Sequence, residues 1–507
     1  MYNRNINFAK NNIIHSRQWE KKRSLLYKAG RFLLVIFLTL FVISFALSYK
    51  AIFSQETFGG TLAKLPVVSY IKALIGGEDK LSKDNDRLNF LMMGIGGAGH
   101  DGALLTDTIM LASVKLSTKE IALLSIPRDL LVKIPNNGWQ RINHASAYGE
   151  LNNYPGGGSA LAAKTIEETF DAPINYWVRI DFDGFMRVID DIGGIDITVE
   201  RAFTDNGYPT DDHEVQTIHF DAGLQHMDGK TALIFVRSRH GDNLEGSDFA
   251  RSRRQQKILL AIKDKILNWK TFLNPNRVYS IYDNAKNNIE TNIEAWQLPQ
   301  IVDLFKGLNF DGIRYHIIDD SPGGLLKPMI TEDGAAVLAP KAGGLSELQE
   351  FLQNVFVINE IEKNNISVII ANGTTIEGLA TYTGSTLESW GFNIARLINS
   401  PQQDFEKTVI YNLSENDNGE ALKIIKDRMQ ANVTEDVPEF LRPILYKTDD
   451  WGEEKKIDAE FLVVVGFDQQ KAIQAIKEWD AEQARLAVMV SKEKGKIDEK
   501  NTNNNLK

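Results

Sequence analysis

The sequence contains no cysteine among its 507 residues. This absence excludes a disulfide framework, a cysteine-ligated zinc site and a thiol nucleophile. The sequence also lacks a GxxxxGK[ST] loop and a GxSxG turn, so we expect neither a P-loop enzyme nor an α/β-hydrolase. With 43% hydrophobic and 24% charged residues, the composition is that of a globular protein. The length predicts about three domains.

Negative charge exceeds positive charge outside the N-terminal segment. Residues 1–31 hold eight lysines and arginines and one glutamate, which gives a net charge of +7. The whole chain carries −10, so the remainder carries −17. Nucleic-acid binding needs a broad basic surface, and we therefore expect no nucleic-acid partner.

The basic segment precedes one long uncharged hydrophobic run, at 32–49, which residues 51–53 extend beyond Lys50. A membrane-spanning helix needs roughly 20 apolar residues, whereas the apolar part of a cleaved signal peptide is shorter. The length therefore favours a transmembrane helix over 32–53. Because basic residues lie on its N-terminal side, the positive-inside rule predicts a cytoplasmic N-terminus and extracytoplasmic C-terminal domains. We expect a single-pass protein of the cell membrane.

Short apolar runs alternate with helical spacings along the rest of the chain. This alternation is typical of layered α/β domains, and a second, smaller α/β domain is expected near the C-terminus. The charged, asparagine-rich tail is expected to be partly disordered. The predicted divisions are a basic segment at 1–31, the transmembrane helix at 32–53, a juxtamembrane linker at 54–86, a main domain at 87–345, a linker at 346–365, a C-terminal domain at 366–467 and a tail at 468–507.

A glycine loop at 94–99 satisfies the dinucleotide fingerprint GxGxxG and follows an expected strand at 88–95. However, that fingerprint requires a helix to begin at its third glycine. Here another strand is expected from Thr108. We therefore interpret the segment as a flexible loop and not as a dinucleotide site.

Arginines gather around an expected strand at 231–239 and an expected amphipathic helix at about 247–269. Arg237 and Arg239 are two residues apart, so on a strand both would project from one face. Helical spacing brings four further polar residues near the helix start: Asp248, Arg251, Arg254 and Gln255. One guanidinium group can bind two phosphate oxygens at once and stays charged, so a cluster of arginines suits a pyrophosphate. The alternative is a solvated helix face with Asp248 paired to Arg251.

Further polar residues lie at the ends of expected strands, where open α/β sheets bind ligands. They are Arg128 and Asp129 after the 120–126 strand, Arg141 after a polar loop, and Asp101 and Asp107 before the 108–114 strand. Carboxylates beside an arginine-held pyrophosphate are natural magnesium ligands. His144 is interpreted as structural.

Five segments together resemble the LytR-CpsA-Psr family of cell-envelope phosphotransferases. They are LLTDTIML at 104–111, SIPRD at 125–129, RINHA at 141–145, DAGLQHMDGKTALIFVRSRH at 221–240 and DFARSRRQQ at 248–256. The likeness covers about residues 87–345, and residues 366–467 look like the accessory C-terminal domain of the family.

The resemblance implies an α/β/α fold with a central mixed sheet and an apolar tunnel for a polyprenyl-pyrophosphate lipid. It implies an enzyme that transfers a lipid-linked glycopolymer, through its phosphate, to peptidoglycan or a similar wall acceptor. Positions that match the pyrophosphate contacts of the family are Arg128, Arg237, Arg239, Arg251 and Gln255, with a looser match at Arg141 and Arg254. Asp248 matches a supporting acid and Asp107 a magnesium ligand.

One position departs from the family pattern. The family usually has a second metal-linked aspartate after the first strand, where this chain has Gly96. Either Asp101 supplies the missing carboxylate or the magnesium site has one carboxylate ligand fewer. The proton of the acceptor hydroxyl would pass to Asp129 or Asp101, and the sequence does not decide between them.

Two other functions remain open at this point. The same pocket would serve a pyrophosphatase that hydrolyses polyprenyl pyrophosphate, with water as the nucleophile. It would also serve a non-catalytic lipid- or glycan-binding protein, which needs the arginines more than the metal. The C-terminal domain has no recognisable catalytic arrangement, and a role in binding or positioning the acceptor is a hypothesis.

Overall fold

The structure is a computed structural model that describes residues 86–471 and the isolated positions 474, 478, 481 and 485. Within that range, residues 211–213, 247, 268–287, 295–296, 311, 322, 332–333, 342–343, 415–417 and 449–452 are not described. No helix in the described part of the chain is both long and apolar enough to span a membrane. The predicted transmembrane helix at 32–53 lies outside the described residues, as do the basic segment, nearly all of the juxtamembrane linker and most of the tail.

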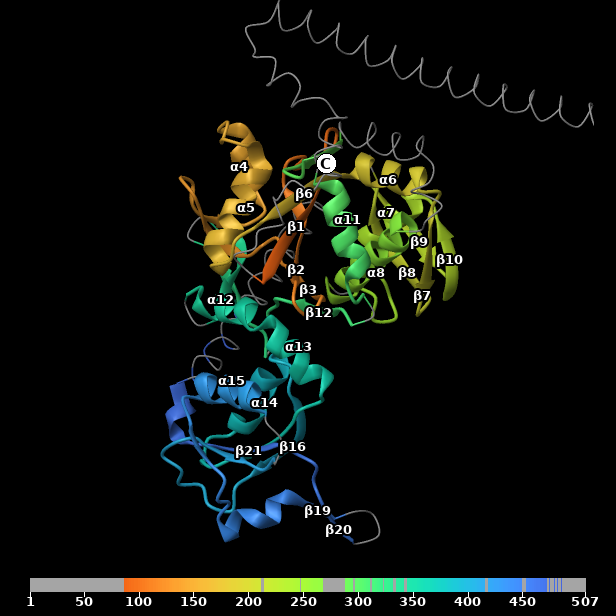
Figure 1. Ribbon diagram of the computed structural model, residues 1–507. Coiled ribbons are helices and arrows are strands. Elements are labelled where there is room, and N and C mark those ends of the chain that lie inside the picture. The colour runs from red at the N-terminus through yellow and green to blue at the C-terminus, as the bar shows by residue number, and fades with distance from the viewer. Residues whose placement is uncertain are drawn as a thin grey trace, which may run out of the picture. The chain divides into compact units, whose positions relative to one another are not determined.

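The main domain is built on a mixed six-stranded sheet (Figure 1). In spatial order its strands are β11 (Ile289–Thr291), β6 (Tyr176–Asp181), β1 (Arg87–Ile95), β2 (Thr106–Lys115), β3 (Glu120–Ile126) and β12 (Arg314–Ile317). β1 runs parallel to β6 and antiparallel to β2, and β3 runs parallel to β12. The predicted α/β architecture with a central mixed sheet is confirmed.

Alternation along the strands separates the two faces of this sheet. Leu91 pairs with Leu111, which pairs with Leu124, and all three belong to one hydrophobic core. That core also contains residues of α5 (Gly157–Phe170), which lies beside α4 (His144–Leu151). The neighbouring pair, Met92 and Met110, points to the opposite face because successive side chains alternate across a strand.

The opposite face is covered by α6 (Phe182–Asp191), α7 (Gly229–Arg237) and α8 (Asp248–Leu267), as Figure 1 shows. A second hydrophobic core joins these helices to a small β region. The strands of that region are β7 (Ile195–Val199), β8 (Phe203–Pro209), β9 (Val215–Phe220) and β10 (Gly223–Met227). β8 pairs with β9, and its register shifts between Asp205 and Tyr208.

The expected strand at 231–239 is wrong, because residues 229–237 form helix α7. Asp228 caps the helix, and its carboxylate accepts a hydrogen bond from the Thr231 N–H at 2.8 Å. A short apolar run has the same composition in a buried helix and in a buried strand, so periodicity alone did not separate them. The Asp228 cap and the packing against α6 and α8 stabilise the helical conformation.

The remaining elements of the main domain are short. They are β4 (Leu131–Ile134), β5 (Gly138–Arg141), α11 (Leu298–Gly307), β13 (Leu326–Ile330) and β14 (Ala336–Pro340). The segment predicted as a linker at 346–365 instead forms two helices, α12 (Ser346–Gln353) and α13 (Val355–Lys363). Buried apolar residues recur along both helices, which favours packed helices over a solvated linker.

The C-terminal domain has a five-stranded sheet. In spatial order its strands are β16 (Asn393–Asn399), β15 (Ser367–Asn372), β21 (Phe461–Val465), β17 (Val409–Asn412) and β18 (Asn432–Thr434). β15 and β21 are buried along their whole length, because helices and loops cover both faces of the sheet. The other elements are α14 (Leu379–Ser389), α15 (Gly419–Met429), the 3₁₀ helices η1 (Glu439–Leu445) and η2 (Phe467–Gln469), and the hairpin of β19 (Tyr446–Thr448) and β20 (Glu454–Lys456).

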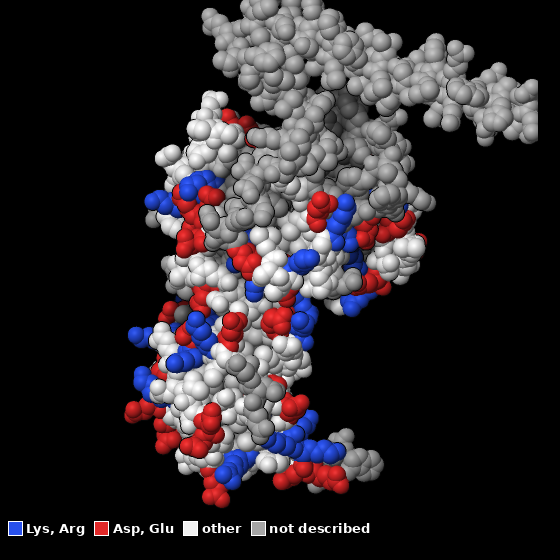
Figure 2. Space-filling model, viewed as in Figure 1, with Lys and Arg blue, Asp and Glu red and all other residues white. Residues whose placement is uncertain are grey.

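Charges of both signs are mixed over the surface. On the face shown in Figure 2, lysine and arginine side chains alternate with aspartate and glutamate over both domains.

Candidate functional site

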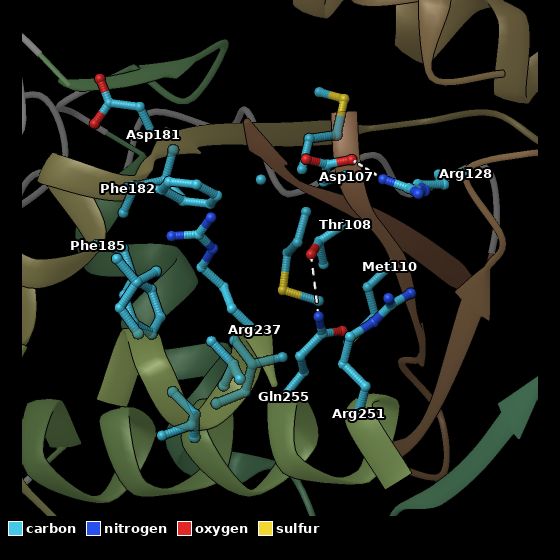
Figure 3. A pocket seen from close by; sticks show the side chains of 18 of the residues that line it. Asp107, Thr108, Met110, Arg128, Asp181, Phe182, Phe185, Arg237, Arg251 and Gln255 are labelled. Atoms are coloured by element: carbon cyan, nitrogen blue, oxygen red, sulfur yellow. Dashed lines mark hydrogen bonds and ion pairs between the residues drawn. The ribbon is translucent and has the colours of Figure 1, made fainter. Parts of the chain in front are cut away.

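A cavity of about 650 Å³ lies between the sheet and helices α6, α7 and α8. Most of its wall is apolar, with contributions from Met92, Met110, Phe185, Val236 and Ile258. Polar side chains also line the cavity: Asp107, Thr108, Arg128, Asp181, Asp205, Arg237, Arg239, His240, Arg251 and Gln255. Figure 3 shows Arg237, Arg251 and Gln255 rising from the helices toward Thr108, Asp107 and Arg128 on the sheet side. A long apolar chain with a charged head would match such a wall.

Arg128 and Asp107 form an ion pair at the sheet side of the cavity. The Arg128 Nη1 atom donates to Asp107 Oδ1 at 2.5 Å, and both side chains are about one-third exposed, at 32% and 37%. The two residues follow or begin neighbouring strands, so they meet at the same edge of the sheet. An anion at this edge would meet a guanidinium that already stands beside a carboxylate.

Arg237 and Arg239 both line the cavity, although no strand carries them. Arg237 is the last residue of α7, and the extended backbone of Ser238 ends the helix, with φ −55° and ψ 135°. The Arg237 guanidinium lies over the Phe182 ring, 4.3 Å from its centroid, and 5.7 Å from the Tyr208 ring centroid. Aromatic faces attract guanidinium groups, so these rings help to hold Arg237 in place.

Helix α8 contributes Arg251 and Gln255, which are four residues apart and therefore share a helix face. Gln255 donates from Nε2 to the Thr108 hydroxyl at 3.1 Å, which links the helix to β2 (Figure 3). Arg251 lies in the first turn of the helix, where the helix dipole also favours an anion. Asp248 is the first residue of α8, but its side chain lies outside the described part of the chain.

Arg254 does not line the cavity, contrary to its predicted role as a pyrophosphate ligand. It is buried, with 2% exposure, beneath the C-terminal end of α7. Its guanidinium donates to the Phe235 carbonyl at 2.9 Å, to the Ser238 carbonyl at 2.6 Å and to the Glu245 carboxylate at 2.6 Å. Burial lowers the pKa of Arg254, and Glu245 opposes that shift. Helical rotation from Arg251 turns this side chain into the protein interior.

Asp129 and Arg141 also lie outside the cavity lining. Arg141 Nε is 3.5 Å from Asp129 Oδ1 and donates to the Ala336 carbonyl at 2.9 Å. Asp129 Oδ2 is 3.6 Å from Arg128 Nε, so this pair contacts the site only through Arg128. Neither residue is placed to contact a ligand in the cavity directly.

The two remaining predicted residues differ in their surroundings. Asp101 lies in the turn that follows the glycine loop and is not part of the cavity lining. His144 begins α4, with its ring edge-on to Tyr148 at 5.9 Å. Burial and Arg141 lower the pKa of His144, whereas Asp129 raises it.

Three carboxylates line the cavity, and all three accept hydrogen bonds. Asp107 accepts one from Arg128, whereas Asp181 and Asp205 each accept several. Asp181 caps α6 and also accepts from the Asn288 amide. Asp205 accepts from backbone N–H groups and from a hydroxyl. Asp107 is therefore the lining carboxylate best suited to a metal ion. No group of three or more histidine, aspartate or glutamate residues able to hold a metal occurs among the described residues. One carboxylate with diphosphate oxygens nevertheless fits magnesium, which needs few protein ligands.

Several residues in or beside the cavity wall were not singled out by any sequence motif. Phe182 and Tyr208 contact Arg237 through their rings, and Asp205 contacts the segment that carries Arg239. Asp205 is 33 residues from Ser238 along the chain, and no motif spacing signals that contact.

Two family models match the sequence of this chain. The model of the LytR_cpsA_psr family matches residues 67–354. A second model, described as LytR cell envelope-related transcriptional attenuator, matches residues 365–441.

Curated relatives carry transferase names. The polyisoprenyl-teichoic acid–peptidoglycan teichoic acid transferase TagU of Oceanobacillus iheyensis is 31% identical over 257 residues, which are 48% of this chain and 74% of that protein. The corresponding transferase TagV of Bacillus subtilis is 32% identical over 212 residues, 41% of this chain and 50% of that protein. A crystal structure of B. subtilis TagV is 27% identical, covers 53% of this chain and 96% of that chain, and has a TM-score of 0.41.

These matches define an enzyme of the transferase class, as the sequence analysis predicted. The family model spans more than half of the 507 residues. The chain belongs to the LytR_cpsA_psr family, and the predicted resemblance is confirmed.

Proposed function

We propose that this protein transfers a glycopolymer from a polyprenyl-pyrophosphate carrier to peptidoglycan or a similar cell-wall acceptor. The observation that carries the proposal is a cavity of about 650 Å³ with a mostly apolar wall, which Arg128, Arg237, Arg239 and Arg251 also line. An isoprenoid chain suits the apolar wall, and a pyrophosphate suits several guanidinium groups that cannot lose their charge. The names of the curated relatives supply the class of donor and acceptor.

In the proposed reaction, a hydroxyl oxygen of the acceptor forms a bond to the sugar-proximal phosphorus. The bond between this phosphorus and the oxygen that bridges the two phosphates breaks, the lipid monophosphate leaves, and the hydroxyl proton is released. Arginines on the cavity wall stabilise the negative charge that grows on the leaving phosphate. Asp129 and Asp101, the two predicted proton acceptors, do not line the cavity, and the proposal gives neither that role.

Magnesium is part of the proposal, with Asp107 as its protein ligand. When bound, the ion would neutralise charge on the pyrophosphate oxygens. Gly96 provides no carboxylate, so the diphosphate itself would supply most of the oxygen ligands. Asp107 also fixes the Arg128 guanidinium at 2.5 Å, which orients this arginine toward the same phosphate.

A reconstituted transfer assay with a lipid-linked glycan donor and peptidoglycan tests the proposal. Arg237→Gln should lower the transfer rate by about 10²–10³-fold, the size of effect seen when one charge-stabilising donor is removed. Arg253→Gln is the matched control, because Arg253 is 53% exposed and is not part of the cavity wall. Equal rates for Arg237→Gln and the wild type would refute the pocket assignment. Free glycan phosphate in place of a wall-linked product would show a pyrophosphatase, and binding without turnover would show a non-catalytic lipid-binding protein.

We also propose that residues 32–53 anchor the protein in the cell membrane with the catalytic domain outside the cytoplasm. The uncharged run and its basic N-terminal flank support this topology. Fractionation of the full chain and of a variant without residues 1–53 tests it. The full chain should sediment with membranes after a high-salt wash, whereas recovery of the full chain in the salt supernatant would contradict the anchor.

A further inference from the structure

The segment Ser238–His240 lies between two buried charged side chains, one on each side. Asp205 of β8 contacts its N–H groups, and Arg254 of α8 contacts its carbonyl side. We propose that Asp205 is a positioning residue that, together with Arg254, fixes where Arg239 projects into the cavity. This inference rests on the proposed function, because it assigns Arg239 a diphosphate to bind.

The carboxylate of Asp205 is saturated by donors. Oδ2 accepts from the Ser238 hydroxyl at 2.6 Å and from the backbone N–H groups of Arg239 and His240, both at 3.0 Å. Oδ1 accepts from the Gly207 N–H at 2.9 Å. The side chain is 1% exposed. Hydrogen bonds to an ionised acceptor are stronger than neutral ones, so the backbone on both sides of the Arg239 Cα is held firmly.

Arg254 completes this arrangement from the opposite side. Its guanidinium donates to the carbonyls of Phe235 and Ser238, in the last turn of α7 and just beyond it. The last carbonyls of a helix have no partner within the helix, and a cation there satisfies them. The end of α7 therefore cannot fray, and the step from Arg237 to Arg239 keeps one geometry.

Strand β8 contacts the segments of both Arg237 and Arg239, and a register shift lies between the two contacts. The register of β8 against β9 shifts between Asp205 and Tyr208, as it does at a β-bulge. Asp205 at one end of the bulge holds the backbone of Arg239, and the Tyr208 ring at the other end lies near the Arg237 guanidinium. Bulges commonly re-aim side chains next to active sites.

A catalytic role for Asp205 does not fit these contacts. Its oxygens already accept four hydrogen bonds, and its side chain is almost fully buried. A general base or a metal ligand needs a free oxygen that faces the substrate. The same saturation keeps its negative charge from repelling a diphosphate, because the surrounding N–H and O–H dipoles balance it.

A double-mutant cycle with geranyl pyrophosphate as the probe tests the proposal on the full-length protein. Asp205→Asn should weaken binding at least tenfold. The amide keeps only one acceptor oxygen, and its NH2 group would face the N–H and O–H groups that now donate to the carboxylate. In an Arg239→Gln background the same substitution should weaken binding less than twofold further, because the residue on which Asp205 acts is already absent. A role in general stability would lower affinity by the same factor in both backgrounds.

Asp242→Asn is the matched control. Asp242 also accepts a backbone N–H of β8, from Thr204 at 2.7 Å, but it is exposed and is not part of the cavity wall. It should leave binding within twofold of the wild type. If Asp205→Asn does not fold, Ser238→Ala carries the same cycle, because it removes one donor from Oδ2 and leaves the chain intact.

The outcomes separate the two levels of the proposal. A wild-type protein that does not bind geranyl pyrophosphate would refute the proposed function. Wild-type binding with an unchanged Asp205→Asn affinity, or with equal losses in both backgrounds, would refute the positioning role alone. A loss that disappears with Arg239→Gln would establish it.

Discussion

Replacing Arg254 with methionine distinguishes a ligand-binding arginine from one that holds the fold. The Arg254 side chain is 3% exposed and is paired with Glu245, which is 12% exposed. Its guanidinium also donates to two carbonyl oxygens at the end of α7. Methionine is unbranched and fills most of the vacated volume, so the main loss is polar.

The expected loss follows from these contacts. Removing one partner of a buried ion pair costs about 3–5 kcal/mol, because the other charge and its acceptors stay buried. Arg253 Nη2 lies 3.8 Å from the Glu245 carboxylate and can compensate in part, so we expect the lower end of that range. A loss of about 3 kcal/mol is large beside a typical folding free energy of about 5–15 kcal/mol.

Native-state hydrogen exchange is the appropriate assay, because it reports opening free energies locally and does not require the two domains to unfold together. Amides of α7 and α8 should lose about 3 kcal/mol of protection in Arg254→Met, while amides of β15 and β21 stay unchanged. Arg253→Met is the control, and its exposed pair should contribute at most about 1 kcal/mol. Equal protection in the two variants would refute the structural role. Loss of geranyl pyrophosphate binding with unchanged hydrogen-exchange protection would show that Arg254 acts in ligand binding and not in stability.

Three further predictions concern the cavity. Phe182→Leu removes the aromatic face under Arg237 and should weaken geranyl pyrophosphate binding, measured by calorimetry, by about 0.5–2 kcal/mol. Phe182→Tyr keeps an aromatic face and should bind with the wild-type affinity. An unchanged affinity in the leucine variant would show that the ring contact does not contribute to binding. Asp107→Asn should abolish the stimulation of transfer by added magnesium while metal-free binding persists, and retained stimulation would place the metal elsewhere. Burial makes the largest contribution to the pKa of Asp205 and raises it, but the Ser238 hydroxyl and the backbone N–H groups together outweigh burial and lower that pKa below its ordinary 3.8. Since the folded pKa is the lower one, Asp205 stabilises the fold above about pH 3.8 and loses this effect as the pH falls. Denaturation of Asp205→Asn and wild type should therefore differ by a constant amount at neutral pH and converge in acid, and a difference that grows in acid would contradict the shift.

The sequence predicted the architecture well because its signals are local. Apolar runs of strand length and segments with helical spacing follow one another from residue 87 onward, and they predicted the α/β class that the structure shows. Where the local signal was ambiguous, the prediction was wrong. The run before Arg237 suits a helix or a strand equally, and only its Asp228 cap and its neighbours make it helical. A polar linker was predicted near residues 359–365, yet this stretch belongs largely to α13, in which Ile361 is buried.

By itself, the sequence determined the family, the class of enzyme and the kinds of side chain available for an anion. Motifs such as SIPRD and DFARSRRQQ carry this information because they combine residue type with fixed spacing. Spacing within one element also predicts which side chains share a face, as for Arg251 and Gln255.

Only the tertiary structure decided which of these side chains reach the cavity. Arg254 is three residues from Arg251 and turns into the core, while Asp129 and Arg141 contact the cavity only through Arg128. Asp205 joins the site from a strand more than 30 residues away. The physical reason is that periodicity orients a side chain relative to its own helix or strand, whereas the packing of distant elements determines whether that direction leads to a cavity, to the core or to solvent.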